Sequence, residues 1–394
     1  MKNILILGGG FAGVEAAIYL KKYGFSVTLL SDREYLFVYP VSIWIPTGKN
    51  SFEDVCISLK QLQQVHGFKL VIDKVEFIKS AKKKVYCKNK EYTYDYLILA
   101  LGSDKVEHKG IKNTLSICAK PVESMKIKES LDQLIQKGGG NISFGFGSNP
   151  LDSSNVRGGP IFELLFNIHH KLDKQGIRKN FELTFFAPMK EPGARMGKKA
   201  LKMMDSYFQR LNIKKITGKK IAEFKKDGIL FEDNTFLNSD LTLFIAAGSG
   251  HRALKNSDLP LNEAGFVKIN DYCEVEFPKD RIEKQRDVFA IGDCAAIEGP
   301  SWRAKQGHVA EVMARNCAYN IKQMYNKSHH KKTYKEHLNI LCIMDSGDGA
   351  AFVYRSDKKA VMIPMPLFGH QIKKAWGWYY RNSKLNKIPR IPGL

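Results

Sequence analysis

The chain has 394 residues, of which 44% are hydrophobic and 26% charged, a composition that is typical of globular proteins and excludes wholesale disorder. It is long enough for two or three domains. Its net charge of +22 indicates either a polyanionic neighbour or a lysine-rich solvated surface. The seven cysteines show no CxxC spacing, so we expect neither a disulfide framework nor a metal site.

The opening stretch "MKNILILGGG" leads directly into a strand, which leaves no room for a signal peptide. No apolar run approaches the ~20 residues that a membrane-spanning helix needs. The cytosol, or the membrane surface that faces it, is therefore the expected compartment.

The first elements form a strand–turn–helix–strand unit. Hydrophobic periodicity predicts a strand at Ile4–Leu7, a turn at Gly8–Gly13, a helix at Val14–Tyr23 and a strand at Val27–Leu30. This order is the one that a nucleotide-binding α/β unit requires.

The turn reads Gly8-x-Gly10-x-x-Gly13. Its first glycine permits a tight turn, the second lets the backbone approach phosphates, and the third lets helix and strand pack closely. Such turns also occur without ligands, but this strand–turn–helix context favours a dinucleotide site. The ribose contact falls on Ser31 or Asp32 at the end of the second strand, and the residues alone do not choose between them. The cofactor contacts predicted here are Gly8, Gly10, Phe11, Ala12, Gly13, Ser31 and Asp32.

The remainder of the chain repeats this organisation at low similarity. We predict short strands between 69 and 101 and a second α/β unit from Asn141 through 181–188. A strand follows at 241–247, then a buried strand with a turn within 287–297, a helix at 303–321, and a distinct tail from near Tyr325. The expected fold class is α/β, with two Rossmann-like dinucleotide-binding domains and a membrane-facing C-terminal region. The first domain is discontinuous (1–104 and 241–324), the second spans 105–240, and the C-terminal region spans 325–394.

Two later segments, "YDYLILALGS" and "DVFAIGDCA", resemble the second and third signatures of two-dinucleotide-binding flavoproteins. Together with the glycine turn, this resemblance implies bound FAD. Asp293 would contact the ribityl chain, and Gly292 would allow close approach. Further contacts are assigned to Val75, Ala100, Gly102 and Lys305. Lys305 would stabilise negative charge at N1/O2 of the reduced ring with the helix dipole, and a solvated lysine is the alternative.

A narrower resemblance is to the sulfide:quinone oxidoreductase and flavocytochrome c sulfide dehydrogenase flavoprotein group. The segments that carry it are "TLSICAKPVES", "RGGPIFE", "WRAKQGHVAEV" and "LCIMDSGDGAAFVY". Disulfide reductases would need a CxxxxC near residue 40, where this chain has "YLFVYPVSIWIPTGK" without a cysteine.

The resemblance implies a relay of two cysteines beside the flavin. Cys342 matches one of them, Cys118 matches a third, supporting cysteine, and the position of the other relay cysteine is Arg157. Arg157 would stabilise reduced flavin or an acidic substrate, or else it faces solvent and pairs with a carboxylate such as Asp152. Glu163 would move protons, or else it is a helix-surface carboxylate. The catalytic candidates are thus Cys342, Cys118, Arg157 and Glu163.

The segment at 145–165 is where a nicotinamide fingerprint would stand. It reads "GFGSNPLDSSNVRGGPIFELL", a long polar turn without the Gly-x-Gly-x-x-Gly pattern. This difference disfavours NADH as the electron donor.

The last segment is aromatic and basic. Phe368, Ile372, Ala375, Trp376 and Tyr379 recur at helical spacing, whereas Gln371, Lys373 and Lys374 fall largely elsewhere on the helix. From Asn320 onward, 14 Lys and Arg stand against 4 Asp and Glu, a net of +10. This pattern favours anionic lipid, although the helix could instead pack its aromatic face on the protein.

The expected function is a peripheral-membrane FAD oxidoreductase at the cytoplasmic face of the inner membrane, which passes electrons from sulfide or another reduced sulfur species to quinone. The alternatives are an NADH:quinone oxidoreductase of the single-subunit type and a flavin-containing binding or sensor protein. We expect no nucleic-acid partner, because basic and aromatic residues are not interleaved outside the tail. Homo-oligomerisation is possible.

Overall fold

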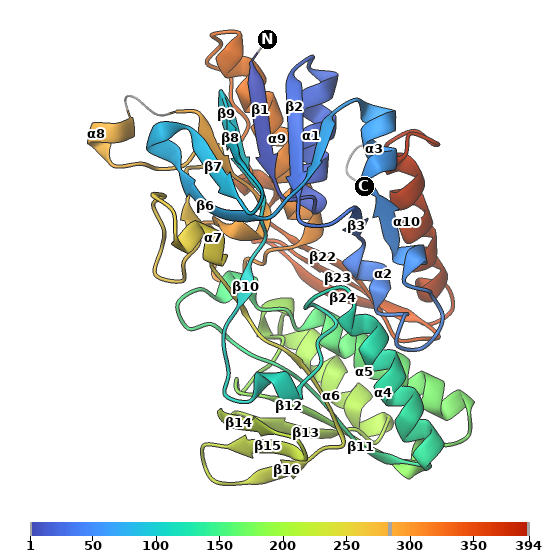
Figure 1. Ribbon diagram of the computed structural model, residues 1–394. Coiled ribbons are helices and arrows are strands. Elements are labelled where there is room, and N and C mark those ends of the chain that lie inside the picture. The colour runs from blue at the N-terminus through green and yellow to red at the C-terminus, as the bar shows by residue number, and fades with distance from the viewer. Residues whose placement is uncertain (1, 283–285, 392–394) are drawn as a thin grey trace.

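Two parallel sheets, one in each half of the molecule, organise the computed structural model, which describes residues 2–282 and 286–391 (Figure 1). The predicted regions 1–104, 241–324 and 325–394 thus include residues 1, 283–285 and 392–394, respectively, which lie outside the described part. The first sheet has the order β5–β2–β1–β9–β20 with every neighbouring pair parallel. Its strands are β1 (Asn3–Leu7), β2 (Ser26–Ser31), β5 (Lys69–Ile72), β9 (Tyr96–Leu99) and β20 (Val288–Ala290).

Two helices cover the first sheet and pack against each other, α1 (Phe11–Lys22) and α9 (Gly307–Tyr325). The predicted strands are confirmed, but α1 begins three residues early, because Gly10 is its N-cap and the helix starts inside the turn. The predicted start of α9 at 303 is wrong. Gln306 is extended as its N-cap, and the backbone N–H of Lys305 donates to the carbonyl of Ser154 instead of starting a helix.

The second parallel sheet has the order β13–β12–β11–β17. Three helices, α4 (Glu123–Lys137), α5 (Gly159–Lys174) and α6 (Lys198–Arg210), accompany it (Figure 1). Each half also carries a three-stranded antiparallel sheet. The strands concerned are β11 (Gly140–Phe146), β12 (Phe181–Ala187), β13 (Lys214–Thr217), β17 (Leu241–Ile245), β6–β7–β8 (Val75–Lys79, Lys84–Cys87, Glu91–Thr93) and β14–β15–β16 (Ile221–Lys225, Gly228–Phe231, Phe236–Asn238).

The chain passes between the halves where β10 (Asp104–Lys105) pairs antiparallel with β18 (Gly248–Ser249). Short elements complete both halves. They are α2 (Tyr39–Ser42), α3 (Leu59–His66), α7 (Arg252–Lys255), α8 (Lys279–Ile282), β3 (Tyr35–Phe37), β4 (Cys56–Ser58), β19 (Val267–Lys268) and β21 (Ala295–Ala296). The division into domains at these residues stays a prediction.

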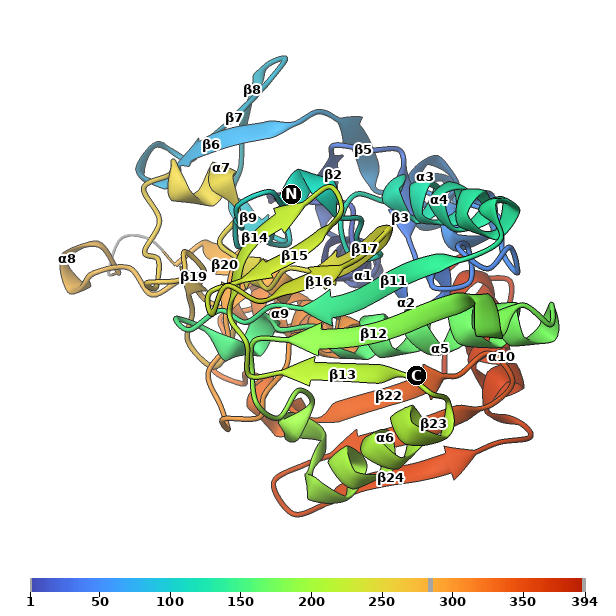
Figure 2. The same ribbon diagram turned by 90° about the horizontal axis from the view of Figure 1, so that it is seen from below.

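The C-terminal residues form an antiparallel sheet of β22 (Ile340–Asp345), β23 (Ala350–Arg355) and β24 (Ala360–Met365), followed by α10 (Gly369–Lys384). Figure 2 shows this sheet beside β13 and α6 of the second half, with α10 at its end. It contacts α5 through β22, and α10 contacts α2, β22 and β23. The C-terminal region therefore brings residues from both halves together.

Helix α10 buries mostly polar residues and exposes apolar ones, whereas an ordinary surface helix buries its apolar residues. Its buried residues are mostly polar: Gly369, His370, Lys373, Tyr380, Ser383 and Lys384. Its exposed apolar residues, with Phe368 just before it, are Phe368, Ile372, Ala375 and Trp378, and we call these four the outer face of α10. Trp376, predicted on the apolar face, instead stacks on Tyr380 at a centroid distance of 5.2 Å. Among the described residues, none of the helices has the length and apolar character to cross a bilayer.

Candidate functional site

The glycine turn between β1 and α1 has the shape that a pyrophosphate needs. Gly8 has φ +113°, and a Cβ there would collide with the carbonyl of Ala100. A Cβ on Gly13 would collide with the carbonyl of Gly8. At Gly10, by contrast, a Cβ would have no atom within 4 Å. The turn is therefore tightly packed on its inner side and open at the N-terminus of α1, where backbone N–H groups attract an anion.

The other predicted contacts surround this turn. Ala12 is buried, and the Phe11 ring lies 5.2 Å from that of Tyr380 on α10. Gly102 has φ +76° with open space where a Cβ would be. Val75 is buried at the start of β6. These residues fit an FAD, although their contacts with it stay predictions.

At the end of β2, the two ribose candidates differ in availability. The Ser31 hydroxyl is buried and donates to the carbonyl of Arg33 at 2.7 Å. The Asp32 side chain is 68% exposed, with a carboxylate 3.9 Å from the Arg33 guanidinium. Because a ribose hydroxyl needs an accessible acceptor, Asp32 is the better placed of the two.

Asp293 contacts two cationic side chains, Arg157 and Lys305. We call the glycine turn Gly8–Gly13 together with these three residues the cofactor end. Asp293 lies in the short helical turn Gly292–Cys294, where Gly292 has φ +69°. Its carboxylate forms an ion pair with Arg157, and its carbonyl accepts a hydrogen bond from Lys305 Nζ at 3.0 Å. Arg157 thus pairs with a carboxylate, as the expected alternative had it, but the partner is Asp293 and the side chain is only 25% exposed. Asp152 instead accepts from the backbone N–H of Ser154 at 2.8 Å.

Lys305 is buried, so the expected alternative of a solvated lysine is also wrong. Burial lowers its pKa to about 8, against the opposing effect of Asp152 and Asp293. Lys105 behaves similarly, because burial lowers its pKa to about 8 and Arg157 adds to the shift. Both lysines are still cationic below a pH of about 8. A buried cation of this kind can stabilise an anion that forms beside it.

The two cysteine candidates lie in opposite electrostatic surroundings. Burial raises the pKa of Cys118, while the Arg157 guanidinium, which is hydrogen-bonded to the thiol, and Lys105 act to lower it. Burial and, to a smaller extent, the Glu163 carboxylate raise the pKa of Cys342 to about 12, against the opposing effect of Lys373. All seven cysteines are free thiols. Cys118 is therefore the thiol next to positive charge, and Cys342 the one next to negative charge.

Glu163 is buried on α5 and forms an ion pair with Lys373 of α10, which is also buried. Its Oε1 accepts the backbone N–H of Asp345 at 2.7 Å. Burial raises the pKa of Glu163, and Lys373 opposes that rise. The expected alternative of a helix-surface carboxylate is wrong, as is the placement of Lys373 with the exposed Gln371 and Lys374.

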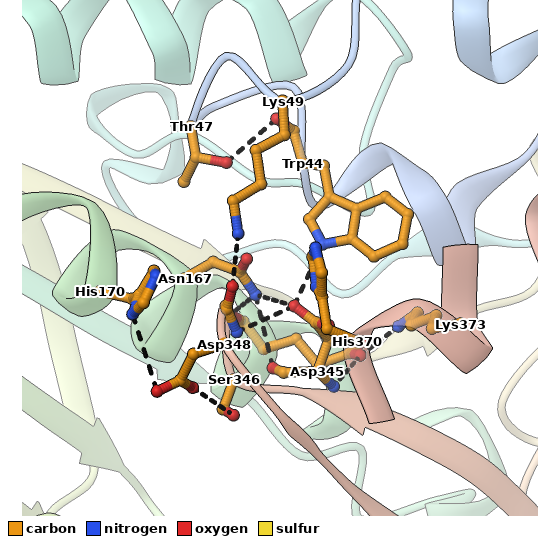
Figure 3. A network of polar contacts seen from close by, with 12 residues as sticks. Trp44, Thr47, Lys49, Asn167, His170, Asp345, Ser346, Asp348, His370 and Lys373 are labelled. Carbon is orange, nitrogen blue, oxygen red and sulfur yellow. Dashed lines mark hydrogen bonds and ion pairs between the residues drawn. The ribbon is translucent and has the colours of Figure 1, made fainter. Parts of the chain in front are cut away.

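Asp345, which the sequence reasoning did not assign, lies at the centre of a buried network (Figure 3). Its Oδ1 accepts from Trp44 Nε1 at 3.1 Å, Asn167 Nδ2 at 2.8 Å and the Gly347 N–H at 3.0 Å. Its Oδ2 bonds His370 Nδ1 at 2.6 Å. We call Trp44, Glu163, Asn167, Asp345, His370 and Lys373 the polar cluster. The one sequence signal for it was the position of Asp345 within the quoted motif "CIMDSGDG".

The pKa of Asp345 falls to about 2. Burial alone would raise it, but the hydrogen bonds from His370, Trp44 and Asn167 stabilise the charged form more strongly. The polar cluster therefore keeps a fixed negative charge at its centre.

Residues 2–318 match the family described as pyridine nucleotide-disulphide oxidoreductase, so the chain belongs to this family. Members of the family and the relatives below are FAD-binding flavoproteins, and the chain is an FAD-dependent oxidoreductase.

Particular relatives narrow the comparison. The chain is 25% identical to a sulfide-quinone reductase from Aquifex aeolicus, over 96% of this chain and 90% of the relative. It is 22% identical to a type II NADH:quinone oxidoreductase from Staphylococcus epidermidis, over 95% of this chain and 96% of that relative. The X-ray structure of the sulfide:quinone oxidoreductase from Aquifex aeolicus has the same fold, with a TM-score of 0.86 and 23% identity. The match covers 98% of this chain and 92% of that structure's chain.

Proposed function

We propose that this chain is a peripheral-membrane FAD oxidoreductase that takes electrons from sulfide or another reduced sulfur species and passes them to a quinone. The relatives that support it carry quinone in their names, one with sulfide and one with NADH. When bound, FAD supplies the two-electron transfer that links such donors and acceptors.

The observation that carries the choice of donor is the connection between β11 and α5. Strand β11 ends at Phe146 and α5 starts at Gly159, so 12 residues separate them, including a helical turn at Ser153–Asn155. A nicotinamide site would need a tight glycine turn here. This connection instead presents Arg157 to Asp293 at the cofactor end.

On the sulfur side we assign Cys118, Arg157 and Cys342. Arg157 replaces one relay cysteine, so a disulfide through that position is impossible. Its guanidinium and Lys105 favour the anionic form of Cys118. Cys342 is buried beside the Glu163 carboxylate and holds its proton until a base removes it. We assign Glu163 as this base, because it is the carboxylate that acts electrostatically on the Cys342 thiol.

For the membrane we assign the outer face of α10. Phe368 is 70% exposed and Trp378 63%, and the neighbouring Leu367 is 76% exposed. An apolar, aromatic helix face beside a region of net charge +10 fits the interface of an anionic bilayer. We place the protein on the cytoplasmic face of the inner membrane, where a lipid-soluble quinone would approach past α10.

The test is to mix purified protein anaerobically with sulfide or with NADH while flavin absorbance is followed, and then to add quinone. We expect sulfide to bleach the flavin and quinone to restore its colour. Rapid bleaching by micromolar NADH, with none by sulfide, would replace this proposal with the second candidate, an NADH:quinone oxidoreductase, which the similarity to the Staphylococcus epidermidis protein favours.

A further inference from the structure

The polar cluster contains two acid–base pairs that lie side by side. One is Glu163 with Lys373, and the other is Asp345 with His370. In each pair the acid comes from an inner element, α5 or β22, and the base from α10. The two bases are three residues apart, which places them on the same side of the helix (Figure 3). The pairs are also linked, because the Asp345 N–H donates to Glu163.

The hydrogen bonds of Asp345 fix the state of the His370 ring. Three donors occupy Oδ1, and Oδ2 is left to the imidazole. An ionised carboxylate keeps the proton on Nδ1, so Nε2 is the nitrogen that gains or loses a proton. No residue in the described ranges hydrogen-bonds Nε2. The ring also packs against Trp44 in an edge contact at 5.2 Å, which restricts its rotation.

Stability alone does not account for this arrangement. Buried ion pairs usually contribute no more than well-packed apolar side chains of similar size. Here two such pairs hold a helix whose apolar side chains, Phe368 and Ile372, face outward. A carboxylate that orients an imidazole with one open nitrogen is the arrangement that general acid–base chemistry uses.

We propose that His370, positioned by Asp345, delivers one of the two protons that a quinone takes up at this site, and this inference rests on the proposed function. Reduction of a quinone to its quinol takes two electrons, from the reduced flavin, and one proton on each oxygen. The doubly protonated His370 releases the proton on Nε2 to one quinone oxygen and keeps the proton on Nδ1. Solvent then reprotonates Nε2 and also supplies the second proton.

Other charged groups lie around the Asp345 loop without bonding His370 or the Asp345 carboxylate. Lys49 donates to the carbonyl of Gly347 at 2.7 Å, and burial lowers its pKa. His170 of α5 lies 3.9 Å from Asp348. Glu163 and Lys373 also face the Asp345 loop, and Lys174, Lys374 and Asp348 act on Lys49 beside it. They do not bond His370, so its proton exchange depends first on Asp345.

The experiment separates proton delivery from electron transfer. Flavin in the purified protein is reduced with dithionite, and its reoxidation is followed in a stopped-flow instrument with a water-soluble benzoquinone or with ferricyanide, which accepts electrons without protons. In His370→Asn the amide nitrogen can replace Nδ1 as donor to Asp345, but no titrating nitrogen remains. We expect reoxidation by quinone to slow by roughly 10²-fold and reoxidation by ferricyanide to stay within about twofold.

The pH profile adds a second readout. The wild-type quinone rate should fall as pH rises, because the acid loses its proton, and the profile of His370→Asn should be flat. His170→Gln is the matched control, a second histidine of the same region that should leave both rates unchanged. Asp345→Asn should reproduce the quinone defect, and its combination with His370→Asn should add nothing further.

Equal slowing with both acceptors, or an unchanged quinone rate in His370→Asn, would overturn the proton-delivery role. If His370→Asn does not fold, His370→Gln provides the same comparison. Wild-type flavin that ferricyanide reoxidises but no quinone does would overturn the proposed function itself, and with it this inference.

Discussion

The glycine turn at the cofactor end owes its shape to the backbone, whereas the polar cluster is held together by contacts between side chains. Gly8 and Gly13 lie within six residues, and each is required because a Cβ would strike a carbonyl of the turn or of its neighbour strand. The polar cluster instead joins side chains from four distant segments, such as Trp44, Asn167, Asp345 and His370. Substitutions should therefore disturb the two regions differently. An added side chain should crowd the glycine turn, whereas removal of a side chain should leave hydrogen-bonding groups of the polar cluster without a partner.

The largest expected effect is at the open position of the glycine turn. Gly10→Val would place a branched side chain where the turn is empty, at the N-terminus of α1. We expect a folded but colourless protein, since the fold does not use that space and the pyrophosphate does. Absorbance near the flavin bands and circular dichroism measure the two properties separately.

Gly13→Ala is the matched control at the same turn. Its Cβ would collide with the Gly8 carbonyl, so this variant should lose stability as well as flavin. Full retention of flavin by Gly10→Val would remove the assignment of this turn to the cofactor.

The next largest effect should follow loss of the central carboxylate of the polar cluster. Asp345→Ala leaves His370, Trp44 and Asn167 without their shared acceptor. Breaking a buried network of this kind costs about 3–5 kcal/mol of unfolding free energy. Asp348→Ala, on the same loop with a side chain 63% exposed, should change it by less than about 0.5 kcal/mol. Urea unfolding of both variants makes the comparison, and equal stabilities would contradict it.

Arg157→Ala tests the link between the two regions. Without the guanidinium, Asp293 and Cys118 lose their partner, and an anion that forms beside the flavin loses a positive charge. We expect reduction by sulfide to slow by a factor that corresponds to roughly 2–4 kcal/mol. Arg178→Ala removes an arginine that bonds only backbone carbonyls in the second half, and it should leave the rate unchanged.

Acid should destabilise the polar cluster. The folded pKa of Asp345, about 2, lies below its ordinary 3.8, so its contribution is fully present above 3.8 and is lost as pH falls toward 2. This contribution is on the order of 2 kcal/mol. Glu15, held by Lys384 and Arg390, acts in the same direction, because its pKa falls from 4.5 to about 2. In Asp345→Asn the urea midpoint should depend less steeply on pH over this window, and an unchanged slope would refute the assignment.

The sequence predicted the cofactor end because its signal is local. The glycine spacing and the strand–helix alternation determine the turn whatever lies elsewhere in the chain. The helix bounds were misplaced: α1 starts inside the turn at Phe11, and α9 runs from Gly307 to Tyr325 instead of from 303 to 321. At α9 the bond from the Lys305 N–H to Ser154 delays the start.

The polar cluster could not be predicted in the same way. A periodic pattern places Lys373 with Lys374 on a polar side, but burial of one lysine depends on Glu163, 210 residues away in sequence. The partner of Arg157 is likewise 136 residues away. The sequence of a helix does not show which of its polar residues are buried, and His370 and Asn167 were missed for that reason.

The smallest effect concerns the outer face of α10, where the apolar side chains left outside by the buried charges should meet lipid. Phe368→Ser and Trp378→Ser remove exposed apolar surface without touching the polar cluster, so folding and FAD content should not change. Each should weaken binding to vesicles that contain anionic lipid by about 1.5 kcal/mol, or roughly tenfold in affinity. Phe236→Ser, on β16 of the second half and 40% exposed, is the matched control. If all three variants sediment with vesicles as the wild type does, α10 exposes its apolar side chains for another purpose, and the route of the quinone must be sought elsewhere on the surface.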